Sequence, residues 1–320
     1  MGAEIVRSEE AATALASLAG QARDYIGQAK AENTLRAYRA DWRDFTAWCE
    51  RAELSALPAA PQTVALYLTD RAETCKVSTL QRRLSAISQV HEVAGYGSPT
   101  KSSPVRLVWQ GIRRAKGVAQ QGKAPAVTAD IRSMVAALPA GALGVRDRAI
   151  LLVGFAGAFR RSELVGLDRG DVELTRPGVT VTLRRSKTDQ EGQGRKLGIP
   201  YGSRPDTCPV RALLEWLEVS AIVEGPLFRP LNRHGGILEG RLSDKAIARV
   251  VKRAAEAAGL DPTRYSGHSL RAGLATSAAT AGVSERAIMQ QTGHRSVGMV
   301  RRYIREGCLF RENAAASVGL

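Results

Sequence analysis

One short segment interrupts every regular pattern around it and constrains the fold more than any other feature. Residues 117–125 read Gly-Val-Ala-Gln-Gln-Gly-Lys-Ala-Pro, with two glycines, one proline and no hydrophobic period. This composition is typical of a linker, because glycine adds backbone freedom and proline cannot donate to helix or strand hydrogen bonds. A chain of 320 residues is long enough for two domains. The sequence therefore predicts two domains joined by a linker over residues 117–126.

Before the linker, the only regular pattern is that of amphipathic helices. Apolar residues recur every three or four positions in four successive stretches, with no strand-like alternation between them. Pro61 stands where the first turn of a helix accepts proline, and Ser78 with Gln81 matches a capping box at the start of the next helix. We therefore expect a small all-helical domain over residues 31–116, after an N-terminal arm or single helix over residues 1–30.

After the linker, helices are combined with a small amount of strand. A helical pattern begins at Thr128, and residues 146–159 are almost entirely apolar, which predicts a helix in the centre of the core. Residues 179–184 alternate apolar and polar side chains, as a half-buried strand does, and residues 196–199 can pair with them. The predicted fold class is mainly α with a small antiparallel β-sheet, and the second domain covers residues 127–306.

The charge balance restricts the partner. The chain carries 46 Lys and Arg against 31 Asp and Glu, a net charge of +15, and most of the excess lies after the linker. An excess of this size favours a polyanion, because binding releases counterions. An acidic membrane fits poorly, since the longest apolar run, residues 149–159, is about half of the ~20 residues that span a bilayer. Nucleic acid is therefore the expected partner.

Cysteine and histidine usage predicts neither a disulfide framework nor a metal site. The four cysteines are scattered without a Cys-x-x-Cys pair, and the four histidines stand apart from any cluster of Asp and Glu. The sequence contains no Gly-rich phosphate loop, so no nucleotide cofactor is implied. The first ten residues contain three glutamates and no apolar signal-peptide core. We expect a protein without a cofactor in the reducing cytoplasm.

The densest group of reactive side chains lies between residues 265 and 305. In order, it contains Ser-Gly-His268-Ser-Leu-Arg271, then Thr-Gly-His294-Arg-Ser, then Arg-Arg-Tyr303-Ile-Arg. The phenol of tyrosine ordinarily has a pKa of about 10, so its use as a nucleophile requires neighbours that take its proton. Guanidinium groups match phosphate oxygens bidentately and keep their charge. The pattern predicts a site built around a phosphodiester.

These residues resemble the C-terminal motif block of the tyrosine recombinase (phage integrase) family. That block reads His-x-x-Arg, then Gly-His, then Tyr nine residues beyond the second His. The residues around these positions are similar to those of Cre-type and Xer-like members. The resemblance assigns the first element to His268 and Arg271, the second to His294, and the nucleophile to Tyr303. It implies a site-specific recombinase that cuts and rejoins DNA through a 3′-phosphotyrosine, with strand exchange through a Holliday junction.

Another arginine motif precedes the predicted strands. Ala-Phe-Arg160-Arg161-Ser-Glu163-Leu resembles the first arginine motif of the family, which implies that Arg160 is catalytic and that Glu163 braces the site by hydrogen bonding. The alternative for Arg160 is a surface ion pair with Glu163. Arg161 is chemically equivalent, but a shift of one residue turns a side chain about 100° around a helix. We therefore expect Arg160, and not Arg161, to reach the phosphate.

The turn between the two predicted strands contains Arg-Ser-Lys187-Thr, which resembles the family's hairpin lysine. The resemblance implies that Lys187 protonates the departing 5′ oxygen. Lys196, on the following strand, is the alternative. An exposed lysine on a turn is otherwise an ordinary solvated charge.

The resemblance also implies how the other residues divide the reaction. Arg160 and Arg271 would hold the two non-bridging oxygens and neutralise the charge that builds on phosphorus. His268 would accept or relay the tyrosine proton, and His294 would hydrogen-bond a phosphate oxygen. The covalent intermediate would keep the bond energy, so neither ATP nor a metal is required.

The resemblance further implies that the partner is double-stranded DNA with an inverted-repeat recombination site, bound by a homotetramer. The helical domain would be the core-binding half of a DNA clamp, and the second domain would be its catalytic half. The tail over residues 307–320 is either a frayed end or a segment that docks into the neighbouring protomer. Two other functions remain as alternatives: a type IB topoisomerase-like enzyme that relaxes DNA, and a non-catalytic sequence-specific DNA-binding protein.

Overall fold

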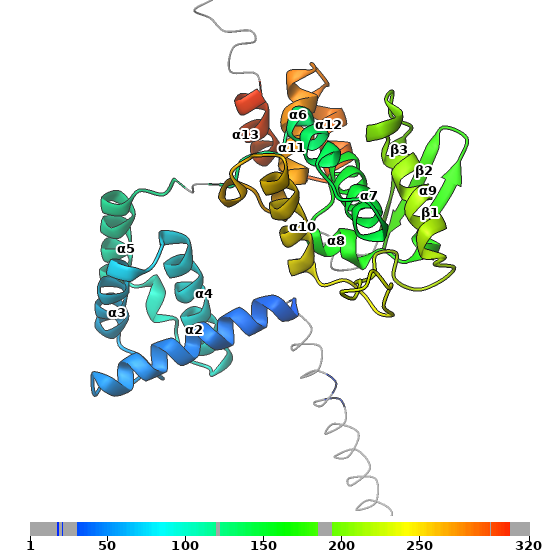
Figure 1. Ribbon diagram of the computed structural model, residues 1–320. Helices are drawn as coiled ribbons and strands as arrows, with labels where there is room; N and C mark the ends of the chain where they lie inside the picture. The colour runs from blue at the N-terminus through cyan, green and yellow to red at the C-terminus, as the bar shows by residue number, and fades with distance from the viewer. Residues whose placement is uncertain are drawn as a thin grey trace, which may run out of the picture. The chain divides into compact units, whose positions relative to one another are not determined.

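The chain divides into two compact units, Met1–Gln121 and Gly122–Leu320 (Figure 1). Helices dominate both units in the part of the chain that is described, and the second unit adds a three-stranded antiparallel sheet. The predicted fold class is therefore confirmed, whereas the individual domain limits stay predictions. The computed structural model describes Leu18, Gln21 and residues 31–119, 122–184, 194–294 and 296–307.

Within residues 31–119, four helices enclose the apolar core of the first unit. They are α2 (Glu32–Arg51), α3 (Pro61–Thr74), α4 (Val77–Val93) and α5 (Ser103–Lys116), with a 3-10 turn, η1 (Pro99–Lys101), before α5. Pro61 occupies the first turn of α3, as predicted, because a proline there forfeits no helical hydrogen bond. The capping box predicted at Ser78 is wrong, because α4 already begins at Val77 and Ser78 lies inside its first turn.

Charged side chains tie three of these helices together around Tyr67. The Tyr67 hydroxyl donates to Asp44 Oδ2 at 2.7 Å, and Arg83 Nη1 donates to the same oxygen at 2.6 Å. Although burial works against it, the hydrogen bond from Tyr67 and the charge of Arg83 hold the pKa of Asp44 below its ordinary value. The carboxylate is therefore ionised at neutral pH and links α2 to α3 and α4.

The second unit is organised around α7, which packs against both α9 and α11. Its described elements are α6 (Thr128–Ala136), α7 (Ala142–Ala156), α8 (Arg161–Gly166), η2 (Arg169–Asp171), β1 (Val172–Thr175), β2 (Gly178–Leu183), β3 (Arg195–Pro200), η3 (Pro205–Thr207), α9 (Pro209–Ser220), α10 (Asp244–Ala257), η4 (Pro262–Arg264), α11 (Gly267–Thr280), α12 (Glu285–Thr292) and α13 (Val297–Gly307).

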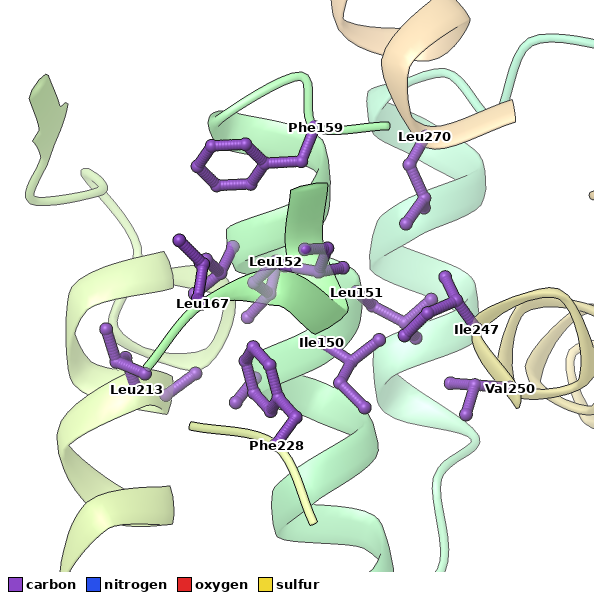
Figure 2. Close-up of a cluster of buried hydrophobic side chains, with 14 of the residues drawn as sticks. Ile150, Leu151, Leu152, Phe159, Leu167, Leu213, Phe228, Ile247, Val250 and Leu270 are labelled. Atoms are coloured by element: carbon purple, nitrogen blue, oxygen red, sulfur yellow. The ribbon is translucent and has the colours of Figure 1, made fainter. Parts of the chain in front are cut away.

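The apolar residues of α7 form the centre of the core. Ile150, Leu151 and Leu152 point into a cluster that includes Phe228 and Ile247 (Figure 2), and none of these side chains is more than 3% exposed. Burying a side chain of this size stabilises the fold by about 1.5–3 kcal/mol. The prediction of a central helix is confirmed, but both of its ends differ, and α7 begins at Ala142, four residues before the predicted start.

The helix ends at Ala156, three residues earlier than predicted. Gly157 closes the last turn, and Ala158 adopts a left-handed backbone with φ of 48°, a conformation that is uncommon outside glycine. Phe159 then folds back and its N–H donates to Gly154 O at 3.2 Å. The carbonyl of Ala158, in this turn, accepts a hydrogen bond from the side chain of Arg271 in α11.

The sheet has the order β1-β2-β3, with antiparallel pairing throughout. Strand β2 matches the predicted strand closely, and β3 extends its predicted partner by one residue at each end. Strand β1 was not predicted, because its four residues expose two successive side chains, Glu173 and Leu174, and so show no alternation. The register pairs Leu183 with Arg195, which sets Arg195 at the end of the sheet.

Candidate active site

Arg160 and Glu163 meet at the beginning of α8. The backbone N–H of Arg160 donates to Glu163 Oε2 at 2.9 Å, and Arg160 Nη1 donates to Glu163 Oε1 at 2.5 Å. The side chain of Glu163 is 2% exposed and that of Arg160 is 19% exposed. One buried carboxylate therefore fixes both the backbone and the guanidinium of Arg160, a charge-assisted contact with little freedom.

Arg161, the first residue of α8, points elsewhere. Its Nη2 lies 3.8 Å from Asp244 Oδ2, and its side chain is 44% exposed. Its aliphatic part lies against Gly267, where a β-carbon would come within 2.3 Å of Arg161 Cγ. The two arginines separate because Arg160 has an extended backbone before the helix. Because Arg160 lies outside the helix, the expected rotation of about 100° between neighbouring helical residues does not explain the different directions of the two side chains.

Arg271, in α11, is the most deeply buried cation of the site, and only 1% of its surface is exposed. Its Nη1 donates to Ala158 O at 2.8 Å, and its Nη2 has no hydrogen-bond partner within the described residues. Burial, followed by the charge of Arg160, lowers the pKa of Arg271 to about 10, so the group is still charged at neutral pH. A buried cationic donor without a partner favours an anionic oxygen, because an unmade hydrogen bond costs free energy.

Tyr303, in α13, faces His268 near the start of α11. The Tyr303 hydroxyl lies 2.9 Å from His268 Nε2, and the two ring centroids are 6.4 Å apart. Val300, which is fully buried, and Ile304 hold α13 in an apolar cluster with residues of α11 and α12. The chain therefore contributes the tyrosine to its own cluster of arginines and histidines.

His294 occupies the turn between α12 and α13. Thr292 Oγ1 lies 2.7 Å from His294 Nδ1 and 2.7 Å from Ile288 O. Because the single hydroxyl hydrogen points to that carbonyl, the oxygen accepts from His294, and the neutral imidazole carries its proton on Nδ1. Burial, followed by the charge of Arg271, lowers the pKa of His294 to about 4. The ring is therefore neutral at neutral pH, with Nε2 as an acceptor.

Arg195 joins this group, although the sequence analysis did not select it. It is the first residue of β3, and its Nη1 donates to Gln290 O at 3.1 Å and to Gln291 O at 3.3 Å, at the end of α12. Burial lowers the pKa of Arg195, with Glu163 opposing and Arg160 reinforcing that shift. An arginine at the start of a strand has no distinctive local pattern, and its partner Gln290 lies 95 residues away in the chain.

The structure brings six of the predicted site residues together in one cluster, and the others lie outside the described residues or apart from that cluster. On Arg271, burial and Arg160 lower the pKa while Glu163 and Tyr303 oppose them, so the charges of these groups act on one another. Lys187 and the tail beyond residue 307 lie outside the described residues, and Lys196 is exposed on β3. The residues gathered are Arg160, Glu163, His268, Arg271, His294 and Tyr303.

The described residues contain neither a metal-binding cluster nor a membrane-spanning helix. In this part of the chain, no group of three or more His, Cys, Asp or Glu is arranged to hold a metal ion. Over the same residues, no helix combines the length and the apolarity needed to cross a bilayer. Apart from the Glu163 carboxylate, the groups that the structure gathers are guanidiniums, imidazoles and a phenol, which can hold an anion, supply an oxygen nucleophile and move its proton.

Two family models match the chain. The model of the phage integrase family covers residues 127–307, and that of the phage integrase N-terminal SAM-like domain covers residues 23–95. The chain belongs to the phage integrase family. The first match includes all six of the gathered residues, and the predicted family is confirmed.

Relatives within this family align with nearly the whole chain. An integrase/recombinase xerD homolog of Selenomonas ruminantium is 42% identical over 298 residues, which are 92% of this chain and 87% of the relative. The recombinase cre of Escherichia phage P1 is 27% identical over 300 residues, which are 87% of this chain and 85% of the relative. The chain is therefore similar to these recombinases in both of its units.

Solved structures share the fold at low sequence identity. A post-cleavage complex of XerH recombinase with a palindromic difH substrate matches with a TM-score of 0.59 and 18% identity, over 81% of this chain and 72% of that one. A lambda integrase dimer bound to a COC′ core site matches with a TM-score of 0.60 and 15% identity, over 91% and 76%. These likenesses show the fold of the family.

Proposed function

We propose that this protein is a site-specific DNA recombinase that cuts and rejoins DNA through a covalent 3′-phosphotyrosine on Tyr303. One observation carries the assignment. The Tyr303 hydroxyl lies 2.9 Å from His268 Nε2, in a cluster whose buried arginine has a donor with no partner in the described residues. Such a cluster offers a nucleophile, a group that takes its proton and a cation for the phosphate. The names of the relatives, integrase and recombinase, support the same class of reaction.

In the proposed step, the Tyr303 oxygen attacks the scissile phosphorus and its proton moves to His268 Nε2. The new tyrosine–phosphorus bond replaces the bond to the 5′ oxygen, which leaves with a proton. Lys187 is the proposed source of that proton, with Lys196 as the alternative. Attack by the 5′-hydroxyl of a partner strand reverses the linkage, so the bond energy is conserved and no ATP is consumed.

Arg160 and Arg271 are proposed to hold the two non-bridging oxygens. The unpartnered Nη2 of Arg271 is suited to this role, because a phosphate oxygen supplies the hydrogen bond that the described residues do not. Glu163 keeps Arg160 in position through two contacts. The pentacoordinate phosphorane carries more negative charge than the diester, so fixed cations stabilise the transition state more than the substrate.

His294 is proposed to donate a hydrogen bond to phosphate only after it gains a proton. In the free protein its Nδ1 proton is directed to Thr292 and its Nε2 is an acceptor. A phosphate beside the ring raises the pKa of His294, because an opposite charge favours the protonated form. Binding of the scissile phosphate therefore takes up a proton from solution.

The proposal extends to the partners: double-stranded DNA with an inverted-repeat site, a homotetramer across two such sites, and exchange through a Holliday junction. The net charge of +15 supports a polyanionic partner. Lambda integrase, whose fold this chain shares with a TM-score of 0.58, is known as a tetramer bound to a Holliday junction. The proposed location is the cytoplasm, on the nucleoid when DNA is bound.

A nicked duplex tests the covalent step. The substrates are duplexes with randomised inverted-repeat arms and a nick close to the expected cleavage position. After cleavage, the short fragment that carries the 5′-hydroxyl dissociates, so the linkage cannot be reversed and the adduct accumulates. Sequencing the DNA in SDS-resistant adducts identifies the recombination site, and Tyr303→Phe is expected to abolish the adduct. Tyr265→Phe is the matched control, because Tyr265 is a buried tyrosine whose hydroxyl contacts Asp130 at 3.2 Å.

The outcomes distinguish the proposal from its alternatives. Absence of any adduct with the wild-type protein, or an adduct that persists in Tyr303→Phe, rejects the assignment. Relaxation of a supercoiled plasmid that lacks the selected site indicates a topoisomerase. Sequence-specific binding without an adduct indicates a non-catalytic DNA-binding protein.

A further inference from the structure

Arg195 connects the sheet to the turn that carries His294. Its Nη1 bridges the carbonyls of Gln290 and Gln291, in the last turn of α12, at 3.1 and 3.3 Å. The last carbonyls of a helix have no partner within the helix and lie at the negative end of its dipole, so a guanidinium is a favourable cap for them. The side chain of Gln291 adds a second link, because its Nε2 donates to Ala156 O at 2.8 Å and to Gly198 O of β3 at 3.3 Å.

The glycine that precedes His294 leaves room for this guanidinium. Gly293 has a left-handed backbone with φ of 64°, and its N–H donates to Met289 O at 2.7 Å. A β-carbon at this position would lie 2.8 Å from Arg195 Cζ and 3.0 Å from its Nη1. Glycine therefore suits this position for two reasons: the turn favours its backbone conformation, and a side chain here would push the guanidinium of Arg195 off the two carbonyls.

The turn held in this way sets the position of the imidazole. Thr292 is fully buried, and its hydroxyl contacts both Ile288 O and His294 Nδ1 at 2.7 Å. The end of α12, Thr292, Gly293 and His294 thus form one rigid corner between β3 and α13. On the other side of His294, α13 carries Tyr303, whose ring centroid lies 6.0 Å from that of the imidazole.

We propose that Arg195 is a positioning residue of the active site: it clamps the corner Thr292–His294 against β3 and so places His294 beside the scissile phosphate. This inference rests on the proposed function. The charge of Arg195 also acts on His294. It is a further cause of the lowered pKa of His294, after burial and the charges of Arg271, Arg160 and His268. Burial is the main reason that the ring is neutral in the free protein, and the charge of Arg195 adds to it in the same direction.

Two substitutions separate the charge of Arg195 from its shape, and a third is the control. R195M removes both, and R195K keeps the charge but loses the planar group that spans two carbonyls. R148M is the matched control, because Arg148 also donates to two backbone carbonyls, those of Asp206 at 2.9 Å and Pro205 at 3.3 Å, and is not among the gathered residues. All three are made in the full chain and compared with wild type.

The cleavage rate is measured on the nicked duplex that the wild-type protein selects. In R195M the rate is expected to fall about tenfold to hundredfold, the effect of a small misplacement of a group at the reacting centre. DNA affinity is expected to stay unchanged, and R195K is expected to recover part of the rate. In the free protein, the NMR titration of the His294 ring is expected to shift to higher pH in R195M and to stay low in R195K and R148M.

The contact between Arg195 and Gly293 gives a test that needs no DNA. G293A adds a β-carbon that collides with the guanidinium and strains the backbone, whereas G259A adds the same strain at φ of 72° with nothing within 4 Å. We expect G293A to lower the thermal midpoint more than G259A does. In an R195A background, where the collision is removed, the two glycine substitutions are expected to cost the same.

Each outcome acts on a separate claim. Unchanged cleavage and an unchanged His294 titration in R195M overturn the role of Arg195. Equal costs of G293A and G259A in the wild-type background overturn the clamp. A wild-type protein that forms no adduct rejects the proposed function instead, and the titration and the glycine comparison still decide whether Arg195 holds the corner.

Discussion

The two arginines proposed to hold the phosphate are predicted to have opposite effects on stability. Arg271 is 1% exposed and has a guanidinium nitrogen without a partner in the described residues, so its charge is buried at a cost. Arg160 neutralises Glu163, whose side chain is 2% exposed. Replacing Arg271 removes an unfavourable buried charge, whereas replacing Arg160 leaves a buried carboxylate without its ion pair. We therefore expect R271M to stabilise the free protein and R160M to destabilise it.

The magnitudes follow from the pKa and from the burial. Burial, followed by Arg160, lowers the pKa of Arg271 from 12.5 to about 10. Each pKa unit corresponds to ~1.4 kcal/mol, so the charged form is disfavoured in the folded state by about 3 kcal/mol at neutral pH. The lost hydrogen bond to Ala158 O offsets about 1–2 kcal/mol of this gain. The expected net effect of R271M is a stabilisation of about 1–2 kcal/mol.

The loss in R160M is of similar size with the opposite sign. Removing one partner of a buried ion pair typically costs about 3–5 kcal/mol. Arg271 and Arg195 still act on Glu163, so we expect a loss of about 2–3 kcal/mol, below that range. For a unit of this size, 1 kcal/mol corresponds to a shift of about 2–4 °C in the unfolding midpoint.

Calorimetry of the full chain without DNA measures both effects in the same buffer at neutral pH. The midpoint of the second unit is expected to rise in R271M and to fall in R160M, while both variants fail to form the covalent adduct. The reasoning is refuted if R271M is less stable than wild type by 1 kcal/mol or more, about the scale of one hydrogen bond. It is refuted equally if both midpoints move in the same direction.

Three further predictions follow from the site. The pKa of His294 falls from 6.5 to about 4 on folding, mainly through burial, so the unfolded chain binds the proton first; stability is therefore lost as the pH drops from 6.5 toward 4, by at most about 3 kcal/mol. Urea titrations at several pH values in this window give the free energy of unfolding of wild type and of H294N. The wild type is expected to lose more of this free energy than H294N as the pH falls, and an equal loss in both refutes the shift. Val300→Ala is expected to cost about 1–3 kcal/mol and to slow adduct formation by loosening α13, with Val93→Ala, a 73% exposed valine, as the silent control. Deletion of residues 310–320 is expected to reduce cooperative assembly on paired sites and to leave single-site binding intact, as a gel-shift titration shows; unchanged cooperativity rejects docking of the tail.

Much of the fold was predictable because burial on one face leaves a period in the sequence. The helix over Pro61–Thr74 follows from that period and from the proline in its first turn. The central helix follows instead from a continuous apolar run, which the fold buries on every side. The end of α7 did not follow. Its apolar run continues to Phe159, but the chain turns at Ala158, and the turn is held by tertiary contacts, among them the burial of Phe159 and the hydrogen bond from Arg271 to Ala158 O. Strand β1 was missed because a short edge strand need not alternate.

The sequence by itself determined which reactive groups are present and how they are spaced. His268 and Arg271, at i and i+3, lie on the same helix, and the Gly-His element and Tyr303 follow at fixed distances. Such spacing is local, so it can be read directly from the residues.

Only the tertiary structure decided how these groups face one another. It placed the side chain of Arg160 on Glu163 and that of Arg161 beside Asp244. It also set the proton of His294 through the hydroxyl of Thr292. It also brought Arg195 to a helix end 95 residues away. Contacts of this kind depend on the packing of separate elements, and they have no period that the sequence could display.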